Sequence, residues 1–340
     1  MVLHGDNAQG KTSVLEAVHV LATLKSFRES RARRWIQQGQ KTARIRGRIT
    51  GDTGTRRLQW RWAEGARSLS LDEGPAPSLS RWFSTIRAVV FCPEDIAIIR
   101  GEPSLRRRFI DRAAFTLRPA HLDLVQDYRK VLRHKVALLK AGGKAAARPT
   151  FDAELCRLGA RLILRRREAV EALRSPLDTL HTQIAGQGSV GLRLKSTGLG
   201  EVASTEEALR TALEQAIVAK AEEEAARCQA LVGPHRDDLE IRINDQLARP
   251  YASQGQARSV VLALKLAQWS AAGVNGESPM FLLDDLGSEL DAHRRGRLLE
   301  LLGGLPGQVW VTTTDPGFVA DLPRAQLQLH RVWDGSITPG

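Results

Sequence analysis

The sequence predicts an α/β fold, with one lobe built on a mixed sheet and a second lobe that is largely helical. Strand and helix patterns alternate near both ends of the chain, whereas the middle is helical in pattern almost throughout. The 340 residues are 42% hydrophobic, which is ample for a globular core. We therefore assign residues 1–100 and 273–340 to lobe I, and residues 101–272 to lobe II.

The first elements of lobe I follow from local patterns. Apolar residues recur three and four positions apart over residues 12–24, which predicts a helix. Residues 43–49 and 57–62 have strand patterns, and turn residues at 51–54 separate them, as in a meander. Residues 88–91 are apolar throughout and predict another strand.

Lobe II is expected to contain long helices over residues 103–115, 120–140 and 151–185. We expect the third helix to break near Pro176, because a proline ring removes a backbone donor from the helical ladder. A short alternating strand is predicted over residues 192–195.

The remainder of lobe II begins with a capping-box pattern. Ser204 and Glu207 have the spacing of such a box and predict a helix that runs to about residue 231. Alternating apolar residues predict a strand over 239–243, and a returning strand over 248–251 after a two-residue turn.

The chain then alternates between helix and strand. Helices are predicted over residues 255–272 and 291–302, and strands over 280–283 and 309–312. The strand at 280–283 is wholly apolar, as expected for a strand buried on both faces of a parallel sheet.

Charge favours a polyanionic partner. The formal net charge is +12, and two stretches concentrate it. Residues 25–48 hold nine Lys or Arg against one acid, and residues 100–135 hold ten against four. Each stretch taken alone is also compatible with a solvated surface, because charge runs usually lie in solvent.

Several classes of protein are disfavoured. The sequence has no run of about eighteen apolar residues and no signal-peptide pattern, so we expect no membrane role and a cytoplasmic location. Cys92, Cys156 and Cys228 form no CxxC pair, which argues against a zinc site or a disulfide framework. We expect them to be small core residues.

A phosphate-binding loop is predicted near the start of the chain. A GxxxxGKT pattern follows the apolar pair Val2 and Leu3 and leads into a helix. Its residues are Gly5, Asp6, Asn7, Ala8, Gln9, Gly10, Lys11 and Thr12. Glycines let successive amides point at phosphate, Lys11 would supply charge to the β and γ phosphates of ATP, and Thr12 would hold Mg²⁺.

Two carboxylates follow the apolar strand at 280–283. In P-loop enzymes a carboxylate at this place holds the second side of magnesium, and Asp284 is the better candidate. Asp285 is expected to orient or deprotonate the attacking water. We therefore predict Asp284 and Asp285 as the catalytic pair.

An SxGQ sequence, residues 253–256, opens the helix predicted from residue 255. Ser253, Gly255 and Gln256 are expected to bind a γ-phosphate at this helix start. The sequence lies between the P-loop and the two carboxylates, which are followed by residues 288–291 (SELD). This order is that of ABC-type ATPases, so the fold prediction becomes a P-loop ABC-ATPase head whose helical lobe carries the signature motif.

Along nearly its whole length the chain resembles the RecF family of bacterial recombination mediators, relatives of SMC and Rad50 head domains. The matching residues are 5–12 with 15–17, 26–28, 93–95, Gly101, Pro103, 107–109, Asp111, 233–239, 252–256 with Arg258, 284–285, 288–291 and 312–314. The GPHRDD and ASQGQ blocks are more specific than any Walker motif.

The resemblance implies an ATP-dependent homodimer that sandwiches two nucleotides with Mg²⁺. Lys11 and Thr12 of one chain and Ser253 and Gly255 of the other would hold each ATP. It further implies a weak, DNA-stimulated ATPase that binds double-stranded and gapped DNA, cooperates with RecO and RecR, and helps to load RecA.

The sequence departs from the wider pattern in two ways. Chains of this family carry about thirty strand-rich residues ahead of the P-loop, so we expect either a late start codon or missing first strands. ABC ATPases generally have Glu after the magnesium Asp and His at the final strand end. Here Asp285 and one of Thr312–Thr314 occupy those places, which predicts slow hydrolysis.

Two alternatives belong to other classes. An SMC- or Rad50-like structural ATPase needs a long coiled coil, and the stretch between Arg100 and Gly233 is too short for one. The ATPase subunit of a membrane transporter would not need the Arg-rich helical insertion.

His235 and Arg236 are either catalytic or part of a hydrogen-bonded turn.

The predicted DNA contacts lie on one helix. They are Arg106, Arg107, Arg108 and Arg112. No base-reading motif is present, so binding should be electrostatic and independent of sequence. Alternatively, some of these residues pair with Asp111, or Arg107 or Arg108 serves the ATP site or the lobe interface. Trp60, Trp62 and Trp82 are expected in the sheet and core, not as base-stacking platforms.

Overall fold

The computed structural model describes residues 1–29, 31–51, 54–141, 148–196, 204–273, 278–285, 292–319 and 327–339. The chain forms two compact units. The sheet unit consists of Met1–Ile96, Thr179–Gly188 and Ser253–Gly340, and the helical unit of Ala97–Asp178 and Ser189–Ala252. Within the described ranges, no helix has both the length and the apolar character needed to cross a membrane.

A six-stranded sheet forms the centre of the sheet unit, in the order β13-β12-β1-β11-β10-β6. Its strands are β1 (Val2–His4), β6 (Ala88–Phe91), β10 (Met280–Leu283), β11 (Val309–Thr313), β12 (Leu329–Trp333) and β13 (Ser336–Pro339). All neighbouring strands are parallel except β12 and β13. The carboxyl ends of β1, β11, β10 and β6 therefore meet at one edge of the sheet.

Local sequence explains the central strands. Phe281, Leu282 and Leu283 of β10 are fully buried, as the uniformly apolar pattern predicts. The predicted strands at 88–91, 280–283 and 309–312 are confirmed as β6, β10 and β11.

Three long helices belong to the sheet unit. They are α1 (Lys11–Thr23), α10 (Gln254–Gly273) and α11 (Ala292–Gly303), close to their predicted bounds. The Lys265 ammonium of α10 donates to the carbonyl oxygen of Val90 at 2.9 Å and to Asp95 at 2.8 Å. Because α10 packs along β6 in this way, residues 253–273 group with the sheet unit, whereas the predicted boundary assigns residues 253–272 to the helical lobe.

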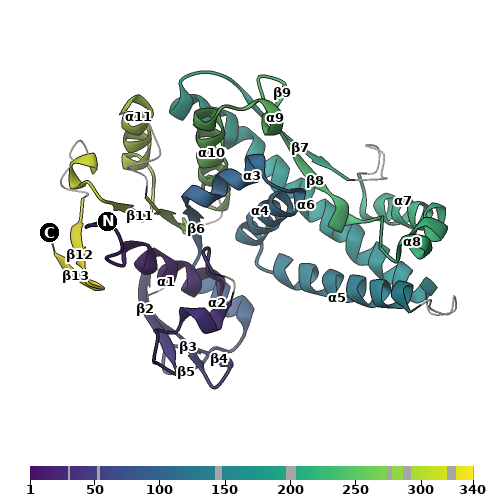
Figure 1. Ribbon diagram of the computed structural model, residues 1–340, viewed down its shortest axis with the longest axis horizontal. Coiled ribbons are helices and arrows are strands. Elements are labelled where there is room, and N and C mark those ends of the chain that lie inside the picture. Colours follow the sequence, from purple (N-terminus) through teal and green to yellow (C-terminus); the bar gives the residue numbers. More distant parts are fainter. Residues whose placement is uncertain are drawn as a thin grey trace. The chain divides into compact units, whose positions relative to one another are not determined.

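An antiparallel meander completes the sheet unit (Figure 1). Its strands are β2 (Ala43–Gly51), β3 (Gly54–Ala63), β4 (Ala66–Leu71) and β5 (Gly74–Pro75). One face packs on α1: Gly47 lies so close to Leu21 that an added Cβ would meet Leu21 Cδ1 at 2.7 Å. Trp60 is buried on this face, and Trp82 donates from Nε1 to the carbonyl oxygen of Leu21 at 2.7 Å. Both tryptophans are core residues, as predicted.

The helical unit combines five main helices with a small sheet. The helices are α4 (Pro103–Leu117), α5 (His121–Lys140), α6 (Arg148–Ala185, of which residues 148–178 lie in this unit), α7 (Glu206–Ala219) and α8 (Ala221–Arg227). The sheet contains β7 (Val190–Lys195), β8 (Asp238–Ile243) and β9 (Gln246–Leu247). Buried side chains of α5, α6 and α7, including Tyr128, Leu162 and Leu213, share one core.

Short elements link these. In the sheet unit they are η1 (Ala32–Trp35), α2 (Leu79–Thr85), η2 (Pro93–Ile96) and η6 (Pro316–Val319), and in the helical unit α3 (Ala97–Arg100), η4 (Pro234–Arg236) and α9 (Ala248–Tyr251). Cys92, Cys156 and Cys228 are free thiols, and the first two are buried. Cys92 and Cys156 are therefore the small core residues that were predicted, whereas Cys228 is only half-buried and its prediction as a core residue is wrong.

Tertiary packing overrides local signals at two places. The expected break at Pro176 is wrong, because α6 continues through it. Leu173 and Leu177, on either side of the proline, are both fully buried, and this packing sustains the helix. The predicted strand at 248–251 is helix α9 instead, because β9 ends after only two residues.

The predicted helix over residues 204–231 begins and ends differently. Thr205, not Ser204, is the N-cap, and its hydroxyl accepts from the Ala208 amide at 3.2 Å. The helix is interrupted at Lys220, and α8 ends at Arg227, followed by its C-cap Cys228 in the left-handed conformation. The sequence of residues 204–231 has no proline or glycine that would predict this interruption.

Candidate nucleotide site

The P-loop connects β1 to α1 at the carboxyl edge of the central sheet. Three of its residues have positive φ: Gly5 (152°), Ala8 (65°) and Gly10 (102°). An added Cβ on Gly5 would collide with the carbonyl oxygen of Val332, so glycine is required there. Asp6, Asn7 and Ala8 are exposed at the tip of the loop.

Lys11 folds back over this loop. Its ammonium donates to the carbonyl oxygens of Gly5 at 2.7 Å and Asp6 at 2.8 Å. Gly10, the N-cap of α1, has no side chain to bond the amides of the first turn. The helix start therefore combines backbone donors, a favourable dipole and a nearby cation, which is the chemistry that a phosphate needs.

Thr12 and Asp284, which are 272 residues apart in sequence, meet at this edge. The Thr12 hydroxyl donates to Asp284 Oδ1 at 2.9 Å, and the Thr312 hydroxyl donates to the same oxygen at 2.7 Å. Burial raises the pKa of Asp284, and the hydrogen bonds from Thr312 and Thr12 oppose that rise. A carboxylate and a hydroxyl this close are the hard oxygen donors that Mg²⁺ prefers, so the donor set fits the predicted metal.

Asp285 follows in a left-handed conformation with φ 49°. Its amide donates to the Thr312 hydroxyl oxygen at 2.9 Å. Thr312 therefore links both carboxylate residues, accepting from the backbone of one and donating to the side chain of the other. The sequence offered a signal for this role, since Thr312 lies near the carboxyl end of β11, the strand beside β10. Residues 288–291 lie outside the described residues.

The hairpin of β12 and β13 also contacts the P-loop, a contact that was not predicted from the sequence. Although far apart in the chain, β12 lies beside β1 (Figure 1). Gln9 accepts from the Asp334 amide at its Oε1 (2.7 Å) and from the Gly335 amide at its backbone oxygen (3.1 Å). Asp334 and Gly335 both have positive φ, and an Asp-Gly pair between strand-like segments is a recognised hairpin signal.

The SxGQ sequence starts α10. The Ser253 hydroxyl accepts from the Gln256 amide at 3.2 Å, and Gln256 Oε1 accepts from the Ser253 amide at 2.9 Å. This reciprocal capping box fixes the helix start. Among the described residues, no hydrogen bond or ion pair joins Ser253, Gly255 or Gln256 to the P-loop, and α10 begins well away from the start of α1 (Figure 1).

Arg294 of α11 covers the glycine of this sequence. An added Cβ on Gly255 would lie 2.6 Å from Arg294 Nη1. Glycine at this position therefore makes room for a guanidinium. No sequence pattern predicts this contact, because it depends on how α10 and α11 pack.

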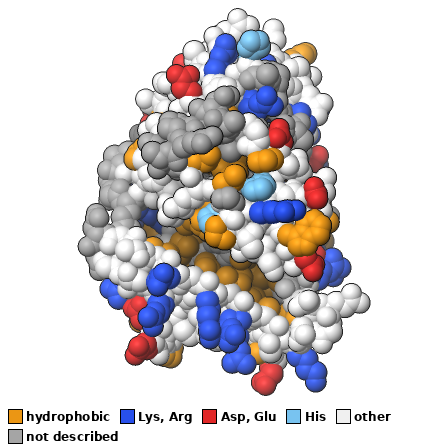
Figure 2. Space-filling model, turned by 90° about the vertical axis from the view of Figure 1, so that its left-hand side faces the viewer, with side chains coloured by type: hydrophobic (Ala, Val, Ile, Leu, Met, Phe, Trp, Pro, Cys, Tyr) orange, Lys and Arg blue, Asp and Glu red, His pale blue; other side chains and the backbone are white. Residues whose placement is uncertain are grey.

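A cavity of about 420 Å³ lies elsewhere in the sheet unit. Its lining includes Met1, Leu302, Val309 and Leu327, and Figure 2 shows a hollow with hydrophobic side chains on the side viewed there. Met1 and Val309 are at the amino ends of β1 and β11. This cavity is therefore at the opposite edge of the sheet from the P-loop.

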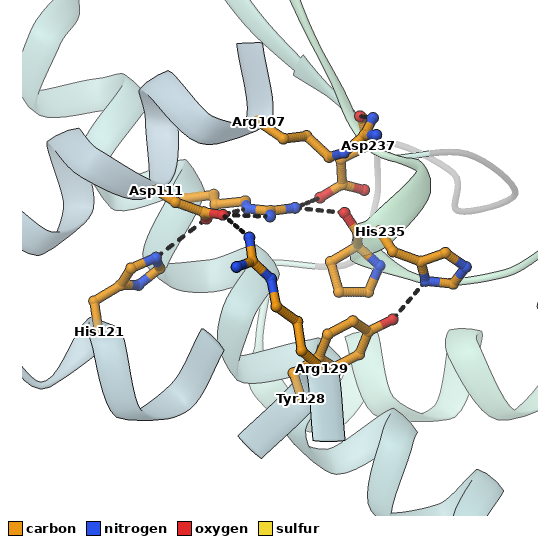
Figure 3. Close-up of polar contacts among 9 residues, drawn as sticks. Arg107, Asp111, His121, Tyr128, Arg129, His235 and Asp237 are labelled. Carbon is orange, nitrogen blue, oxygen red and sulfur yellow. Dashed lines mark hydrogen bonds and ion pairs between the residues drawn. The ribbon is translucent and has the colours of Figure 1, made fainter. Parts of the chain in front are cut away.

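A buried polar network organises the GPHRDD segment of the helical unit (Figure 3). The Arg166 guanidinium bonds to Asp111 at 2.9 and 3.1 Å, to Asp237 at 2.9 Å and to the carbonyl oxygen of Pro234. His121 bonds to Asp111 at 3.2 Å. Burial by itself would raise the pKa of Asp111, but Arg166 and His121 lower it to about 2. Arg166 thus holds α4, α6 and the segment before β8 together.

His235 belongs to a hydrogen-bonded turn. Its Nε2 lies 3.0 Å from the carbonyl oxygen of Ala230, which can only accept, and its Nδ1 lies 2.7 Å from the Tyr128 hydroxyl (Figure 3). Burial lowers the pKa of His235 to about 4. The ring is therefore neutral: Nε2 carries the proton, and Nδ1 accepts a hydrogen bond from the Tyr128 hydroxyl. Of the two alternatives for His235, a catalytic residue or part of a hydrogen-bonded turn, the structure favours the turn.

The four arginines predicted to contact DNA occupy different environments on α4. Arg106 is 4% exposed and bonds through Nε and Nη2 to Asp238 at 2.6 and 3.0 Å. Its prediction as a DNA contact is wrong, because Asp238, distant in sequence, already uses the guanidinium. Arg107 is half-buried and donates to the carbonyl oxygen of Asp237 at 2.7 Å. Arg108 is exposed and Arg112 half-buried.

Comparisons with known proteins agree with this geometry. No protein-family model matches the chain. The chain is 38% identical over 343 residues to the DNA replication and repair protein RecF of Anaeromyxobacter sp. (strain Fw109-5), covering 99% of this chain and 92% of that protein. It is also 38% identical over 343 residues to the RecF protein of Geobacter sulfurreducens, covering 99% and 93%.

Solved structures give the same picture. The structure of the recombination mediator protein RecF-ATP in the RecFOR pathway is similar with a TM-score of 0.88 and 27% identity, covering 100% of this chain and 91% of that chain. An Smc head bound to the C-winged helix domain of ScpA has a TM-score of 0.55 and 16% identity, covering 99% and 88%. The second likeness concerns the fold alone.

Proposed function

Because the chain belongs to the RecF family of DNA replication and repair proteins, we propose that it is an ATP-dependent DNA-binding protein of recombinational repair and replication-fork maintenance. The observation that carries the proposal is the meeting of Lys11, Thr12 and Asp284 at the carboxyl edge of the sheet. The similarity to an ATP-bound RecF structure supports ATP as the nucleotide.

Residues 5–12 bind the phosphates of ATP in this proposal. The amides of the loop and of the first turn of α1 donate to phosphate oxygens, and Lys11 exchanges its two carbonyl contacts for the β and γ phosphates. Thr12 and Asp284 hold Mg²⁺, which would neutralise charge on the phosphates when bound. Thr312 keeps Asp284 oriented through its hydrogen bond.

Asp285 positions or deprotonates the attacking water. Its backbone is held by Thr312 and its φ is positive, so its side chain departs from the strand direction of β10. Asp is one methylene shorter than the Glu usual at this place in ABC ATPases, which favours slow hydrolysis suited to a switch. We propose a weak ATPase that DNA stimulates.

The γ-phosphate contacts of Ser253, Gly255 and Gln256 are made in a homodimer. The capping box presents the start of α10 as a rigid donor surface. Since that surface has no described contact with the P-loop of its own chain, we propose that it completes the site of a second copy when ATP is bound.

The DNA and protein partners follow from the family. The net charge of +12 supports a polyanionic partner, and we propose double-stranded and gapped DNA. Relatives named for DNA replication and repair, and a solved RecF of the RecFOR pathway, support cooperation with RecO and RecR in loading RecA, in the cytoplasm.

The alternatives receive less support. A structural ATPase of SMC or Rad50 type is disfavoured because the likeness to Smc heads is weaker than that to RecF. Among the described residues the longest helix, α6, has 38 residues, which is far shorter than a long coiled coil. No observation favours a transporter subunit.

Two variants test the proposal. Lys11→Ala should weaken binding of fluorescently labelled ATP by about 100-fold, because charge-assisted contacts of about 3 kcal/mol are lost. The exposed Lys41→Ala is the matched control. Ser253→Arg should bind ATP yet stay monomeric in light scattering. An ATP-dependent dimer of Ser253→Arg would contradict the shared site, and unchanged ATP binding by Lys11→Ala would contradict the P-loop assignment.

A further inference from the structure

We propose that the exposed face of the meander β2–β4 binds the phosphate backbone of duplex DNA. This inference rests on the proposed DNA-binding function and assigns it a surface. We call this surface the arginine face. Its charged members are Arg44, Arg46, Arg48, Arg57 and Arg61.

Strand register brings these arginines together. On β2, Arg44, Arg46 and Arg48 alternate with half-buried residues and are all exposed. Across the ladder, Arg44 pairs with Arg61 and Arg48 pairs with Arg57. Because directly paired residues project from the same side of an antiparallel sheet, all five guanidiniums rise from one face.

Apart from Asp72 at the edge of the face, its remaining positions are neutral and polar. Gln59 pairs with Arg46 and accepts from its Nε at 2.7 Å. On β4, Ser68 and Ser70 pair with Arg61 and Gln59. Arginine, glutamine and serine side chains are among those that commonly contact DNA phosphates.

The arrangement is unfavourable for the isolated protein. Like charges placed directly opposite each other across a sheet are destabilising, and the arginine face has two such pairs. Among the described residues, the side chains of Arg44, Arg48, Arg57 and Arg61 form no ion pair. The carboxylate of Asp72, beside Arg57, accepts from the Arg57 amide at 3.0 Å and forms its ion pair with Arg56 at 2.9 Å.

Exposed arginines elsewhere in the chain are treated differently. In the helical unit, Arg157 pairs with Glu154, Arg174 with Glu171 and Arg210 with Glu207, each three residues apart. An ordinary solvated surface of this protein therefore intersperses acids with its arginines. The arginine face has five arginines and a single acid, Asp72 at its edge, which indicates that most of its counter-charge comes from a partner.

The size of the arginine face suits a stretch of DNA backbone. Arg44 and Arg48 are four residues apart on one strand, so their Cα atoms span about 13 Å at about 3.3 Å per residue. One DNA strand presents a phosphate about every 3.4 Å along the axis, so this length faces about four phosphates.

The aromatic residues of the meander point to duplex and not to single-stranded DNA. Trp60 is 1% exposed on the opposite face and packs against Trp35 and Trp62, with ring centroids 5.3 and 6.5 Å apart. Proteins that bind single strands without sequence preference rely on exposed aromatic rings as stacking platforms. The arginine face has none.

The test compares two triple variants with equal loss of charge. The face variant is Arg44→Gln, Arg48→Gln and Arg61→Gln, and the control variant is Arg157→Gln, Arg174→Gln and Arg210→Gln. Binding of a labelled duplex is followed by fluorescence polarisation from 50 to 200 mM salt. Binding of labelled ATP, measured in parallel, shows that each variant is folded.

The face variant should bind duplex more weakly and with a salt slope lower by about 2.7, at about 0.9 per phosphate contact. The ratio of wild-type affinity for duplex to that of the face variant should therefore fall by about 40-fold between 50 and 200 mM salt. The control variant should keep the wild-type slope.

Three results would overturn the inference. If wild type binds duplex but the face and control variants have equal salt slopes, the arginine face is not the DNA surface, and the DNA-binding function itself is unaffected. Wild type that does not bind duplex at 50 mM salt would reject the DNA-binding function as well. Polyglutamate that displaces duplex as well as unlabelled duplex does, at equal charge, would identify the surface as a site for acidic proteins.

Discussion

Replacing Arg166 with Gln removes the cation that bonds to both Asp111 and Asp237 in the helical unit. The guanidinium is 4% exposed and makes four hydrogen bonds. Glutamine is shorter and neutral, so it cannot reproduce the bidentate contact with Asp111. The variant therefore leaves two largely buried carboxylates without their shared counter-ion.

The expected loss of stability is large. Breaking a buried ion pair by removing one partner costs about 3 to 5 kcal/mol, because an uncompensated charge stays buried. At about 2 to 4 °C per kcal/mol for a protein of this size class, the melting temperature should fall by roughly 10 °C. Arg157→Gln on the same helix, whose pair with Glu154 is exposed, should change stability by less than about 1 kcal/mol.

The loss should depend on pH. In the wild-type protein the pKa of Asp111 is about 2, below its ordinary value of 3.8. This group adds stability above about pH 4 that disappears as pH falls through about 2. Without Arg166, burial dominates and raises the pKa of Asp111, so protonation stabilises the folded variant as pH falls. The gap between wild type and variant should narrow from pH 7 to pH 4.

Urea denaturation followed by circular dichroism at pH 7, 5.5 and 4 measures this gap. A difference below about 1 kcal/mol at pH 7 would refute the assignment of Arg166 as the centre of the network. A gap of 3 kcal/mol or more that stays constant down to pH 4 would refute the electrostatic explanation and indicate lost packing instead.

Three further predictions concern the nucleotide site. Thr312→Val should lower ATP turnover by about 10- to 100-fold with little change in ATP affinity, because it removes a partner of Asp284 but no phosphate contact; an unchanged turnover number in steady-state assays would contradict this. Asp285→Asn should lower ATP turnover by about 100-fold or more and retain an ATP-bound dimer in light scattering. Normal turnover by this variant would assign activation of the attacking water to another residue. Gly255→Ala should impair ATP-induced dimerisation without loss of ATP binding, because the new methyl meets the Arg294 guanidinium. Adding Arg294→Ala should restore dimerisation if that collision is the cause, and no recovery would point to a role of Arg294 itself.

The parts of the site that lie within one short segment were predictable from sequence. The P-loop is defined by glycines whose positive φ is needed locally, and β10 by four apolar residues before Asp284. The pairing of Thr12 with Asp284 also followed, because parallel strands bring their carboxyl ends to one edge of a sheet.

Features that depend on distant partners were not predictable. Arg106 has the sequence surroundings of an exposed basic helix, but Asp238 comes 132 residues later and buries it. Pro176 carries a strong breaking signal that packing of Leu173 and Leu177 overrides. The contact of Gly255 with Arg294 depends on helix packing that no local pattern encodes.

The bonds between Gln9 and the turn at Asp334 and Gly335 affect when the nucleotide loop can form during synthesis. The ribosome makes Gln9 325 residues before Asp334, and Asp284 arrives 272 residues after Thr12. A growing chain therefore displays its phosphate-binding sequence long before the groups that brace it exist. Because contacts this distant in sequence form late, the loop on the ribosome lacks its final shape while most of the helical unit can already pack. The geometry described for this loop is therefore complete only once residues 329–335 have joined the sheet beside β1.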